Sequence, residues 1–381
     1  MSVLAPVLAP GATIGILGGG QLGRMLALAA ARIGFKCHVF APTPDSPAFD
    51  VVHRVTHADY ADTQALDRFA ADVDVVTYEF ENVPAETATF LAARVPVLPD
   101  PKVLATTQDR LAEKNFVAGL GIRTAPYAAA GAPSELAAAL DRIGRPAVLK
   151  TRRFGYDGKG QATINNGTDL AAAWSEVGGQ PCIVEAFVPF AREVSVVAER
   201  GRDGAVECFD VSENEHRAHI LKISRVPADL PETTAHAAQR IAEAIADSFA
   251  YVGVLAVEMF VVGGELLVNE LAPRPHNSGH WTLDASATSQ FEQQIRAVCG
   301  VGLGRTTMTE PSIAMVNLLG DLWANGTPDW SVVLDEPRAK LHLYGKSPAR
   351  RGRKMGHLTV TSQVATEAVE RALELRRRCA R

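Results

Sequence analysis

The sequence is poor in cysteine and has no long apolar run. Its 381 residues include five cysteines. They are scattered, without a C-x-x-C pair, at Cys37, Cys182, Cys208, Cys299 and Cys379. We therefore expect neither a disulfide framework nor a zinc site, and a reducing compartment fits. No apolar segment is long enough to span a bilayer, and the N-terminal stretch lacks the basic region of a signal peptide. These absences predict a cytoplasmic protein that is not bound to a membrane.

The sequence also lacks an excess of positive charge. Its 38 basic and 43 acidic residues give a net charge of −5, which argues against a general nucleic-acid binder. Apolar residues make up 47% and charged residues 21%, as is typical of globular proteins. A chain of this length is expected to form two or three domains.

Chemistry-bearing residues are densest in the stretch LAVEMFVVGGELLVNELAPRPHNSGHW, from Leu255 to Trp281. Its pattern predicts two strands joined at a Gly-Gly turn. Carboxylates inside apolar strands are costly to bury unless a cation or donor compensates them, and oxygen ligands suit a divalent metal. A two-residue turn would place Glu258 opposite Asn269, whereas a three-residue turn would place it opposite Glu270. A metal site requires the second register or a bulge. The alternative is an amphipathic hairpin with an exposed loop.

An irregular segment with many anion-binding donors follows the second strand. It contains Arg274, His276, Asn277 and Ser278, among and after two prolines. Carboxylates, arginine and histidine thus converge within one short stretch, which favours a functional site.

The N-terminal part alternates strands and helices, as in a parallel sheet. After the predicted strand Thr13–Leu17, the residues Gly18, Gly20 and Gly23 match the G-x-G-x-x-G fingerprint of dinucleotide-binding turns. That fingerprint also requires an acidic residue after the second strand, Lys36–Phe40, where Ala-Pro follows instead. The NAD hypothesis is thereby weakened, and a glycine-rich turn with another role is the alternative.

Polar residues at this turn and at a nearby strand end are candidate ligand contacts. Gln21 and Arg24 suit a small polar ligand. We predict strands at Val51–Val55 and Val73–Tyr78. Ligands bind at the C-terminal ends of parallel strands, so Glu79 is a candidate contact. An ordinary charged strand end is the alternative.

A glycine-rich loop with several cations follows a strand that ends in lysine. We predict the strand at Ala147–Lys150 and the loop at Arg152–Gly160. Glycine lets backbone N–H groups approach closely, so the loop suits the phosphates of a nucleotide. Its spacing differs from a Walker A loop, and a simple exposed turn is the alternative.

Three further polar residues lie in or beside the next strands. Glu185 is near the end of the predicted strand Cys182–Phe187, whose backbone could face an adenine edge. Glu193 could hold ribose hydroxyls, and His216 lies in a polar stretch. Taken singly, each residue type is more typical of the surface.

The last part of the chain is expected to be β-rich, with a basic loop. Predicted strands at Ala339–Tyr344 and His357–Val360 flank this loop. Its cations are Lys346, Arg350, Arg351, Arg353, Lys354 and, when protonated, His357. A strand on each side favours a specific anion site over a solvated loop. Ala365–Arg381 is predicted to be a terminal helix.

Taken together, five segments resemble the ATP-grasp enzymes, and among them the 5-(carboxyamino)imidazole ribonucleotide synthetases of bacterial purine synthesis. They are GGGQLGRM, FGYDGKGQ, IVEAFVPFAREVS, VNELAPRPHNSGHWT and GRKMGHL, and they span nearly the whole chain. The second and fourth segments together are specific, whereas the first alone is not. The resemblance implies ATP- and bicarbonate-dependent carboxylation of the exocyclic amine of 5-aminoimidazole ribonucleotide, with release of ADP and phosphate.

The resemblance also implies roles for individual residues. The nucleotide site would comprise Arg110, Lys150, Gly155, Tyr156, Asp157, Gly158, Lys159, Gly160, Gln161, Glu185, Ala186, Phe187, Val188, Glu193, His216, Asn269 and Glu270. The magnesium ligands would be Glu258 and Glu270. The ribonucleotide site would comprise Gln21, Leu22, Glu79, Tyr156, Arg274, His276, Asn277, Ser278, Lys346, Arg353 and Lys354. Catalytic roles would fall to Asp157, Lys159 and Arg274, with Asp157 as the first candidate for the general base.

The sequence departs from the family pattern at a few positions. Ala272 stands where many ATP-grasp enzymes have Asn, two residues after the second metal-binding Glu, so the resemblance supplies no third protein ligand. Lys159 stands where Arg is common, which keeps the charge but loses bidentate geometry. Glu185 and Ala186 offer no side-chain amide, so adenine recognition would rest on backbone groups.

We therefore predict an α/β protein with the ATP-grasp fold. Its expected parts are an N-terminal open parallel-sheet domain (1–112), a small ATP-grasp subdomain (113–188), an ATP-grasp core (189–310) and a small C-terminal β-rich part (311–381). Expected ligands are ATP, Mg²⁺, bicarbonate and 5-aminoimidazole ribonucleotide, and a homodimer is expected.

Three alternatives stay open. Another ATP-grasp ligase or formyltransferase would need a different acceptor pocket. An NAD-dependent dehydrogenase would need the acid that is missing after the second strand. A nucleotide-sensing protein would bind ATP without releasing phosphate.

Overall fold

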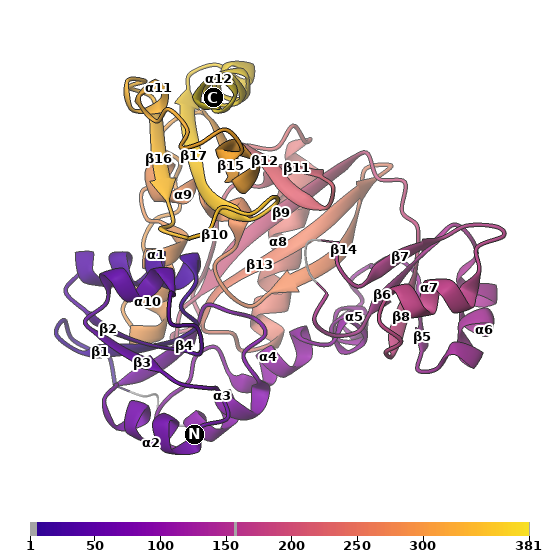
Figure 1. Ribbon diagram of the computed structural model, residues 1–381, viewed down its shortest axis with the longest axis horizontal. Helices are drawn as coiled ribbons and strands as arrows, with labels where there is room; N and C mark the ends of the chain where they lie inside the picture. Colours follow the sequence, from indigo (N-terminus) through magenta and orange to yellow (C-terminus); the bar gives the residue numbers. More distant parts are fainter. Residues whose placement is uncertain (1–5, 156–157, 381) are drawn as a thin grey trace.

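The part of the chain that the structure describes folds around three β-sheets, called here the N-terminal, small and large sheets (Figure 1). The computed structural model describes residues 6–155 and 158–380. Within those residues, no helix combines the length and the apolar character needed to cross a membrane.

The N-terminal sheet is parallel, with strand order β3-β2-β1-β4. Its strands are β1 (Thr13–Leu17), β2 (Lys36–Ala41), β3 (Arg54–His57) and β4 (Val75–Tyr78), and its helices are α1 (Gln21–Arg32), α2 (Thr63–Ala71) and α3 (Ala85–Ala92). The predicted open parallel sheet is thus confirmed. The strand expected at Val51–Val55 was placed too early, because Pro47–Val51 forms a 3₁₀ helix. The fixed φ of proline suits the start of such a turn.

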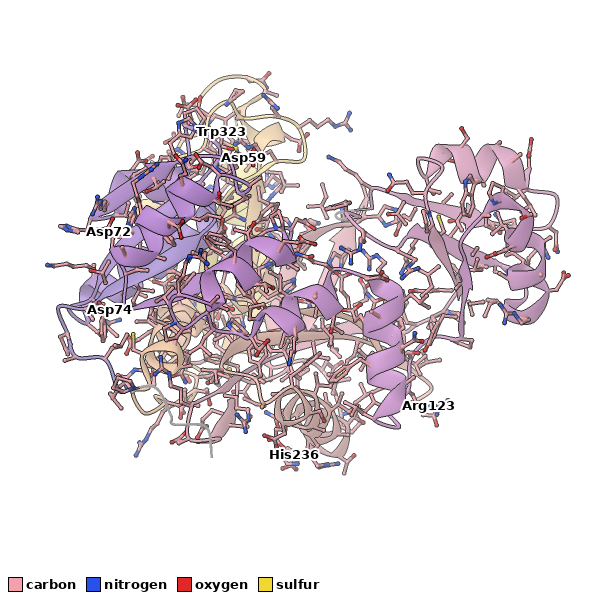
Figure 2. The ribbon with its side chains drawn as sticks, turned by 90° about the horizontal axis from the view of Figure 1, so that it is seen from below. Asp59, Asp72, Asp74, Arg123, His236 and Trp323 are labelled. Carbon is pink, nitrogen blue, oxygen red and sulfur yellow. The ribbon has the colours of Figure 1, made fainter. Side chains whose placement is uncertain are left out.

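The small sheet is antiparallel, with order β5-β8-β6-β7, and forms the lobe on the right of Figures 1 and 2. Its strands are β5 (Tyr127–Ala130), β6 (Ala147–Thr151), β7 (Gln161–Ile164) and β8 (Cys182–Ala186), and its helices are α6 (Pro133–Ile143) and α7 (Leu170–Glu176). Leu136, Leu149 and Trp174 belong to its own apolar core. Helices α4 (Pro101–Thr107) and α5 (Arg110–Gly119) lead into it from the N-terminal sheet.

The large sheet is antiparallel, with order β14-β13-β9-β11-β12-β15-β17-β16 and β10 beside β9. Its strands are β9 (Arg192–Arg200), β10 (Val206–Cys208), β11 (Ser212–Arg217), β12 (Ile220–Val226), β13 (Gly253–Val262), β14 (Glu265–Ala272), β15 (Ser312–Leu319), β16 (Ala339–Leu343) and β17 (Lys354–Ser362). Its helices are α8 (Glu232–Ser248), α9 (Thr282–Ala285), α10 (Gln290–Cys299), α11 (Ser331–Leu334) and α12 (Ala365–Cys379). The C-terminal strands join it through the β12–β15 pair. Strands β15, β17 and β16 therefore extend the sheet that the strands between residues 192 and 272 begin.

Helix α10 fixes the N-terminal and large sheets to each other. Its residues Phe291, Ile295 and Val298 share one apolar cluster with Ile14 and Leu26 of the N-terminal sheet and its first helix. The same helix also packs on β9 and β13. Because one buried helix serves both sheets, the loops at their junction are held in place and can build a common site.

The pairing of β16 with β17 depends on a glycine. A Cβ on Gly356 would lie 2.4 Å from the carbonyl oxygen of His342. We expect Gly356→Ala to lower the free energy of unfolding by roughly 1–3 kcal/mol, as overpacking does elsewhere. Gly302→Ala is the matched control, since a Cβ there meets nothing within 4 Å. Equal urea midpoints for the two variants would contradict this expectation.

Candidate active site

Two carboxylates face each other across β13 and β14. The strands are joined by the two-residue turn Gly263–Gly264, which alone would pair Glu258 with Asn269. A bulge shifts the register between Met259 and Glu258, so that Glu258 pairs with Glu270. Asn269 is the extra residue. The structure therefore has the bulged arrangement that a metal site requires.

The two carboxylates have unequal electrostatic surroundings. Burial, followed by the charge of Glu270, raises the pKa of Glu258 to about 7. Burial also acts against ionisation of Glu270, but Arg110 donates to it from Nη1 at 3.0 Å and lowers its pKa overall. A divalent cation would stabilise the ionised form of both groups, so the pair suits such an ion.

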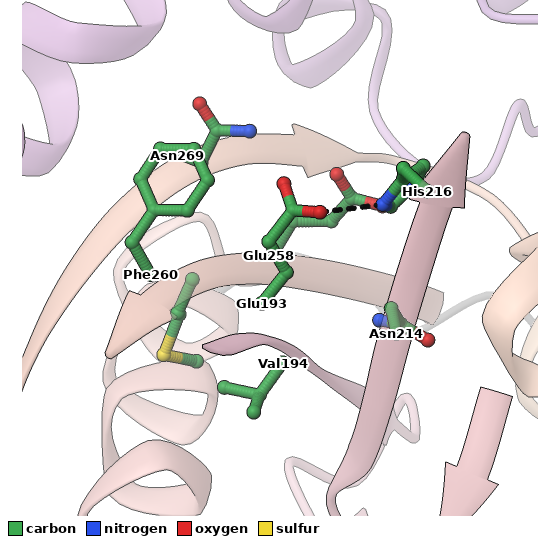
Figure 3. Close-up of a pocket in the computed structure, with 8 residues that line it drawn as sticks. Glu193, Val194, Asn214, His216, Glu258, Phe260 and Asn269 are labelled. Atoms are coloured by element: carbon green, nitrogen blue, oxygen red, sulfur yellow. Dashed lines mark hydrogen bonds and ion pairs between the residues drawn. The ribbon is translucent and has the colours of Figure 1, made fainter. Parts of the chain in front are cut away.

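A small pocket opens beside Glu258 (Figure 3). Its wall includes Glu193, His216 and Asn269. Nδ1 of His216 lies 2.7 Å from Oε2 of Glu193. Burial acts to lower the pKa of His216, but Glu193 and Glu258 raise it overall. Among the described residues Asn269 Oδ1 has no hydrogen-bond partner although it is buried, so the pocket offers an unsatisfied oxygen beside the carboxylates.

A chain of buried hydrogen bonds leads to His276. Asn214 Nδ2 donates to Ser195 Oγ at 2.9 Å, and Ser195 Oγ donates to Ser278 Oγ at 2.7 Å. The Ser278 hydroxyl and its backbone N–H lie 2.9 Å and 3.3 Å from His276 Nδ1. Because the backbone N–H can only donate, Nδ1 is the acceptor and the neutral ring carries its proton on Nε2. Burial lowers the pKa of His276 well below its usual range, so Nε2–H faces Glu258 Oε1 at 3.3 Å.

Lys150 forms an ion pair with the buried Glu185 at the end of the small sheet. Lys150 Nζ lies 2.7 Å from Glu185 Oε2, and Lys114 Nζ lies 3.8 Å from Oε1. Burial opposes ionisation of Glu185, but the two lysines lower its pKa to about 2. The carboxylate therefore orients Lys150.

The glycine-rich loop joins β6 to β7 and reaches the large sheet. Tyr156 and Asp157 lie outside the described residues. A Cβ on Gly158 would lie 2.6 Å from the imidazole of His219, in the turn between β11 and β12. The φ of Gly158 is +79°, so both the close approach and the backbone conformation favour glycine. Gln161 Nε2 also lies 3.3 Å from Nδ1 of His219.

The N-terminus of α5 ties this loop to the carboxylate pair. Arg152, at the start of the loop, donates to the Asp109 carboxylate from Nε at 3.0 Å and from Nη2 at 2.6 Å. Asp109 also caps α5. The next residue, Arg110, donates to Gly155 O at 3.0 Å and to Glu270 Oε2 at 3.0 Å. One arginine thus connects the helix, the loop and one of the two facing carboxylates.

The glycine fingerprint near the N-terminus is filled by a side chain of the same protein. Gly20 N and Gly23 N donate to Glu79 Oε1 at 2.7 Å and Oε2 at 3.2 Å. A Cβ on Gly18 would lie 2.5 Å from Glu79 Oε1. A carboxylate therefore occupies the helix N-terminus where a dinucleotide phosphate would bind. Leu22 is 6% exposed and packs in the core, so its side chain offers a ligand little surface.

Three of the predicted anion-binding cations act on the same buried residue, His280. After burial itself, Lys354, Arg274 and Lys346 each act to lower the pKa of the buried His280. Lys354 also acts to lower the pKa of Glu258. Lys354 and Arg274 thus act on the carboxylate pair as well, whereas Lys346 acts on His280 and Glu79.

Three further predicted residues, Arg274, Asn277 and Arg353, differ in their hydrogen bonding. Arg274 pairs with Glu81 from the loop after β4. Asn277 is buried, and its amide has no hydrogen-bond partner within the described residues. Arg353 donates from Nη1 to Pro348 O at 2.8 Å, so this contact keeps it within its own loop. Arg353 stays a predicted contact of the ribonucleotide, as do Lys346, Lys354 and Arg274.

Sequence reasoning missed two charged residues of α5 that lie beside the site. Glu113 and Lys114 are each 2% exposed. Burial, followed by the charge of Glu270, raises the pKa of Glu113 to about 8. Both residues precede the buried Val117 by three or four positions, so helical spacing places them on the buried face. That spacing was the one signal that could have found them.

Models of three protein families match successive parts of the chain. The ribonucleotide synthetase preATP-grasp domain matches residues 11–108. The ATP-grasp domain matches residues 115–291. The phosphoribosylaminoimidazole carboxylase C-terminal domain matches residues 313–371. The fold and the site therefore define an ATP-grasp protein.

Individual relatives indicate which family of ATP-grasp proteins the chain belongs to. The chain is 49% identical over 355 residues to the N5-carboxyaminoimidazole ribonucleotide synthase of Brucella melitensis biotype 1, covering 92% of this chain and 97% of that protein. A crystal structure of an ADP complex of an N5-carboxyaminoimidazole ribonucleotide synthetase matches with a TM-score of 0.92 at 41% identity, over 97% of each chain. The chain belongs to the N5-carboxyaminoimidazole ribonucleotide synthase family.

A further relative is longer than this chain. The bifunctional purine synthesis protein of Dictyostelium discoideum is 46% identical over 377 residues, which cover 93% of this chain. The match covers 37% of that protein's length.

Proposed function

We propose that the protein uses ATP and bicarbonate to carboxylate the exocyclic amine of 5-aminoimidazole ribonucleotide, giving N5-carboxyaminoimidazole ribonucleotide, ADP and phosphate. The observation that carries the proposal is the facing pair Glu258 and Glu270. Cations of α5, the small sheet and the large sheet act on this pair. Family membership supports the identity of the substrates. Such a site can neutralise the charge of a transferring phosphoryl group and anchor a second anionic substrate.

Glu258 and Glu270 are the proposed ligands of a magnesium ion. Their facing carboxylates, and the unsatisfied Asn269 oxygen beside them, are the oxygen donors that Mg²⁺ prefers. When bound, the ion would supply positive charge at the phosphates of ATP. Lys150 supplies further charge there, held by its ion pair with Glu185.

The nucleotide is proposed to bind between the small and large sheets. Residues 155–161 cover its phosphates, and the backbone of residues 185–188 faces adenine. The hydrogen-bonded Glu193 and His216 suit ribose hydroxyls, because the pair presents a carboxylate oxygen and a ring nitrogen to the pocket. Closure of the loop would exclude water from the reaction.

The proposed chemistry follows from the weakness of bicarbonate as an electrophile. Phosphoryl transfer from ATP gives carboxyphosphate, and the amine of the ribonucleotide attacks it or the CO₂ that it releases. Arg274 and Lys159 are proposed to stabilise the charge that develops. Asp157, outside the described residues, stays the first candidate for the proton acceptor.

Two further properties are proposed. The five cysteines are free, which supports a reducing compartment such as the cytoplasm. The homodimer is proposed as the working assembly, and sedimentation of the purified chain would test it directly.

Phosphate release tests the overall reaction. With ATP and magnesium, we expect ADP and phosphate to form faster when bicarbonate and 5-aminoimidazole ribonucleotide are both present. Each substrate omitted in turn is the control. Formation of AMP and pyrophosphate, or turnover of NAD, would overturn the proposal.

Glu270→Gln tests the metal ligands. The amide keeps the shape of the side chain but removes its charge, so we expect a rate loss of roughly two orders of magnitude or more. Glu265→Gln, on the exposed start of the same strand, is the matched control. Near-wild-type activity of Glu270→Gln at limiting magnesium would show that the assignment is wrong.

Lys354→Ala tests the anchor for the 5′-phosphate of the ribonucleotide. A charge-assisted contact of this kind is worth roughly 1.5–3 kcal/mol, so its loss should raise the KM for the ribonucleotide about ten- to a hundredfold. The KM for ATP should barely change. Lys340→Ala, exposed on β16, is the matched control. A rise in the KM for ATP alone, or in neither constant, would contradict the assignment.

A further inference from the structure

The bulge at Asn269 lies on an edge strand whose outer side is contacted by α5 and the segment after it. Strand β14 ends the large sheet. On its outer side, Val268 N donates to Arg123 O at 2.8 Å. Lys114 Nζ donates to Val268 O at 3.2 Å. Glu113 Oε1 accepts from Leu271 N at 2.6 Å. Two adjacent buried side chains of one helix thus bond the strand on both sides of its bulge.

The spacing of these contacts selects the bulged form. In a regular strand, backbone groups point to the same edge at every second residue. Val268 and Leu271 are three residues apart, so in a regular strand they would point to opposite edges. Both face outward here because one extra residue lies between them. Glu113 would lose its donor if β14 straightened, since the N–H of Leu271 would then turn toward β13.

The apolar side chains of β14 also require the bulged form of the strand. Leu266, Val268 and Leu271 all pack in the same cluster, and their spacing of two and then three residues also requires one extra residue. Glu270 is thereby directed to the opposite face, where Glu258 lies. A straight strand would instead bring Glu270 to the face of that apolar cluster, at a high cost in desolvation.

We propose that Glu113 and Lys114 are positioning residues that hold the bulge in β14, and thereby the alignment of Glu270 with Glu258. The part of this inference that concerns magnesium rests on the proposed function. Lys114 also lies 3.8 Å from Glu185, the partner of Lys150. Helix α5 therefore holds the alignment of the two carboxylates and also supports Lys150 of the small sheet through Glu185.

Hydrogen exchange of the metal-free full-length protein tests the contact without any use of activity. Glu113→Leu should speed exchange of the Leu271 amide about tenfold or more, because its acceptor is lost. Glu113→Gln should restore protection, since the amide oxygen can still accept. Glu199→Leu is the matched control: it removes another buried carboxylate, bonded to Gln293 on the other side of β13. Unchanged exchange in Glu113→Leu, or equal exchange in the Leu and Gln variants, would overturn the proposal.

The magnesium requirement tests the consequence for the site. At saturating ATP, Glu113→Leu and Lys114→Met should each raise the magnesium concentration for half-maximal rate about tenfold. The KM for the ribonucleotide should stay near the wild-type value. If Glu113→Leu fails to fold, Lys114→Met carries the test, as methionine keeps most of the lysine stem. An unchanged magnesium requirement in a folded Lys114→Met variant would overturn the positioning role. Absence of ribonucleotide-dependent phosphate release in the wild type would refute the proposed function instead. The hydrogen-exchange result would still show whether Glu113 holds the Leu271 amide.

Discussion

The facing of Glu258 and Glu270 is the constraint on which the rest of the site depends. Two carboxylates on neighbouring strands of an apolar sheet repel each other and lose hydration, so the fold must compensate them. It does so unequally. Arg110 holds Glu270 ionised, whereas Glu258, with a pKa raised to about 7 by burial and by Glu270, depends on neighbours such as the Nε2–H of His276. The negative charge of the pair is therefore only partly compensated within the protein, and a bound cation would compensate the rest.

The compensating groups come from α5, the small sheet and the large sheet, which are far apart in the sequence. Arg110 reaches from α5 to the glycine-rich loop and to β14. Lys354 on β17 acts on Glu258. Arg274 acts on Glu270 and pairs with Glu81 from the loop after β4. A ligand that took over the Glu270 contact of Arg110 would also act on an arginine that holds the loop. The Glu270 contact and the position of the loop are thus coupled through one side chain.

Much of the fold could be predicted because it depends on local spacing. The strands predicted at Thr13–Leu17, Lys36–Phe40 and Ala147–Lys150 begin where the sequence pattern places them, and each ends within one residue of its predicted end. The bulge could not be predicted, since the turn alone favours pairing of Glu258 with Asn269. What selects the other register is side chains of α5, more than 150 residues earlier, together with the apolar cluster below the strand. Contacts of that range leave no local pattern in the strand itself.

The glycine fingerprint also shows that a local pattern does not reveal a long-range partner. Its spacing correctly indicates a tight turn at a helix N-terminus, where backbone N–H groups point outward and attract an anion. The pattern carries no information about which anion comes. Here Glu79, 59 residues beyond Gly20, supplies it from within the chain, and the glycines provide room for its carboxylate. The motif therefore has a structural occupant, and it fixes Glu79 beside Arg274 and Lys346, whose charges act on it. A turn that elsewhere binds a cofactor serves here to build one wall of the junction between the sheets.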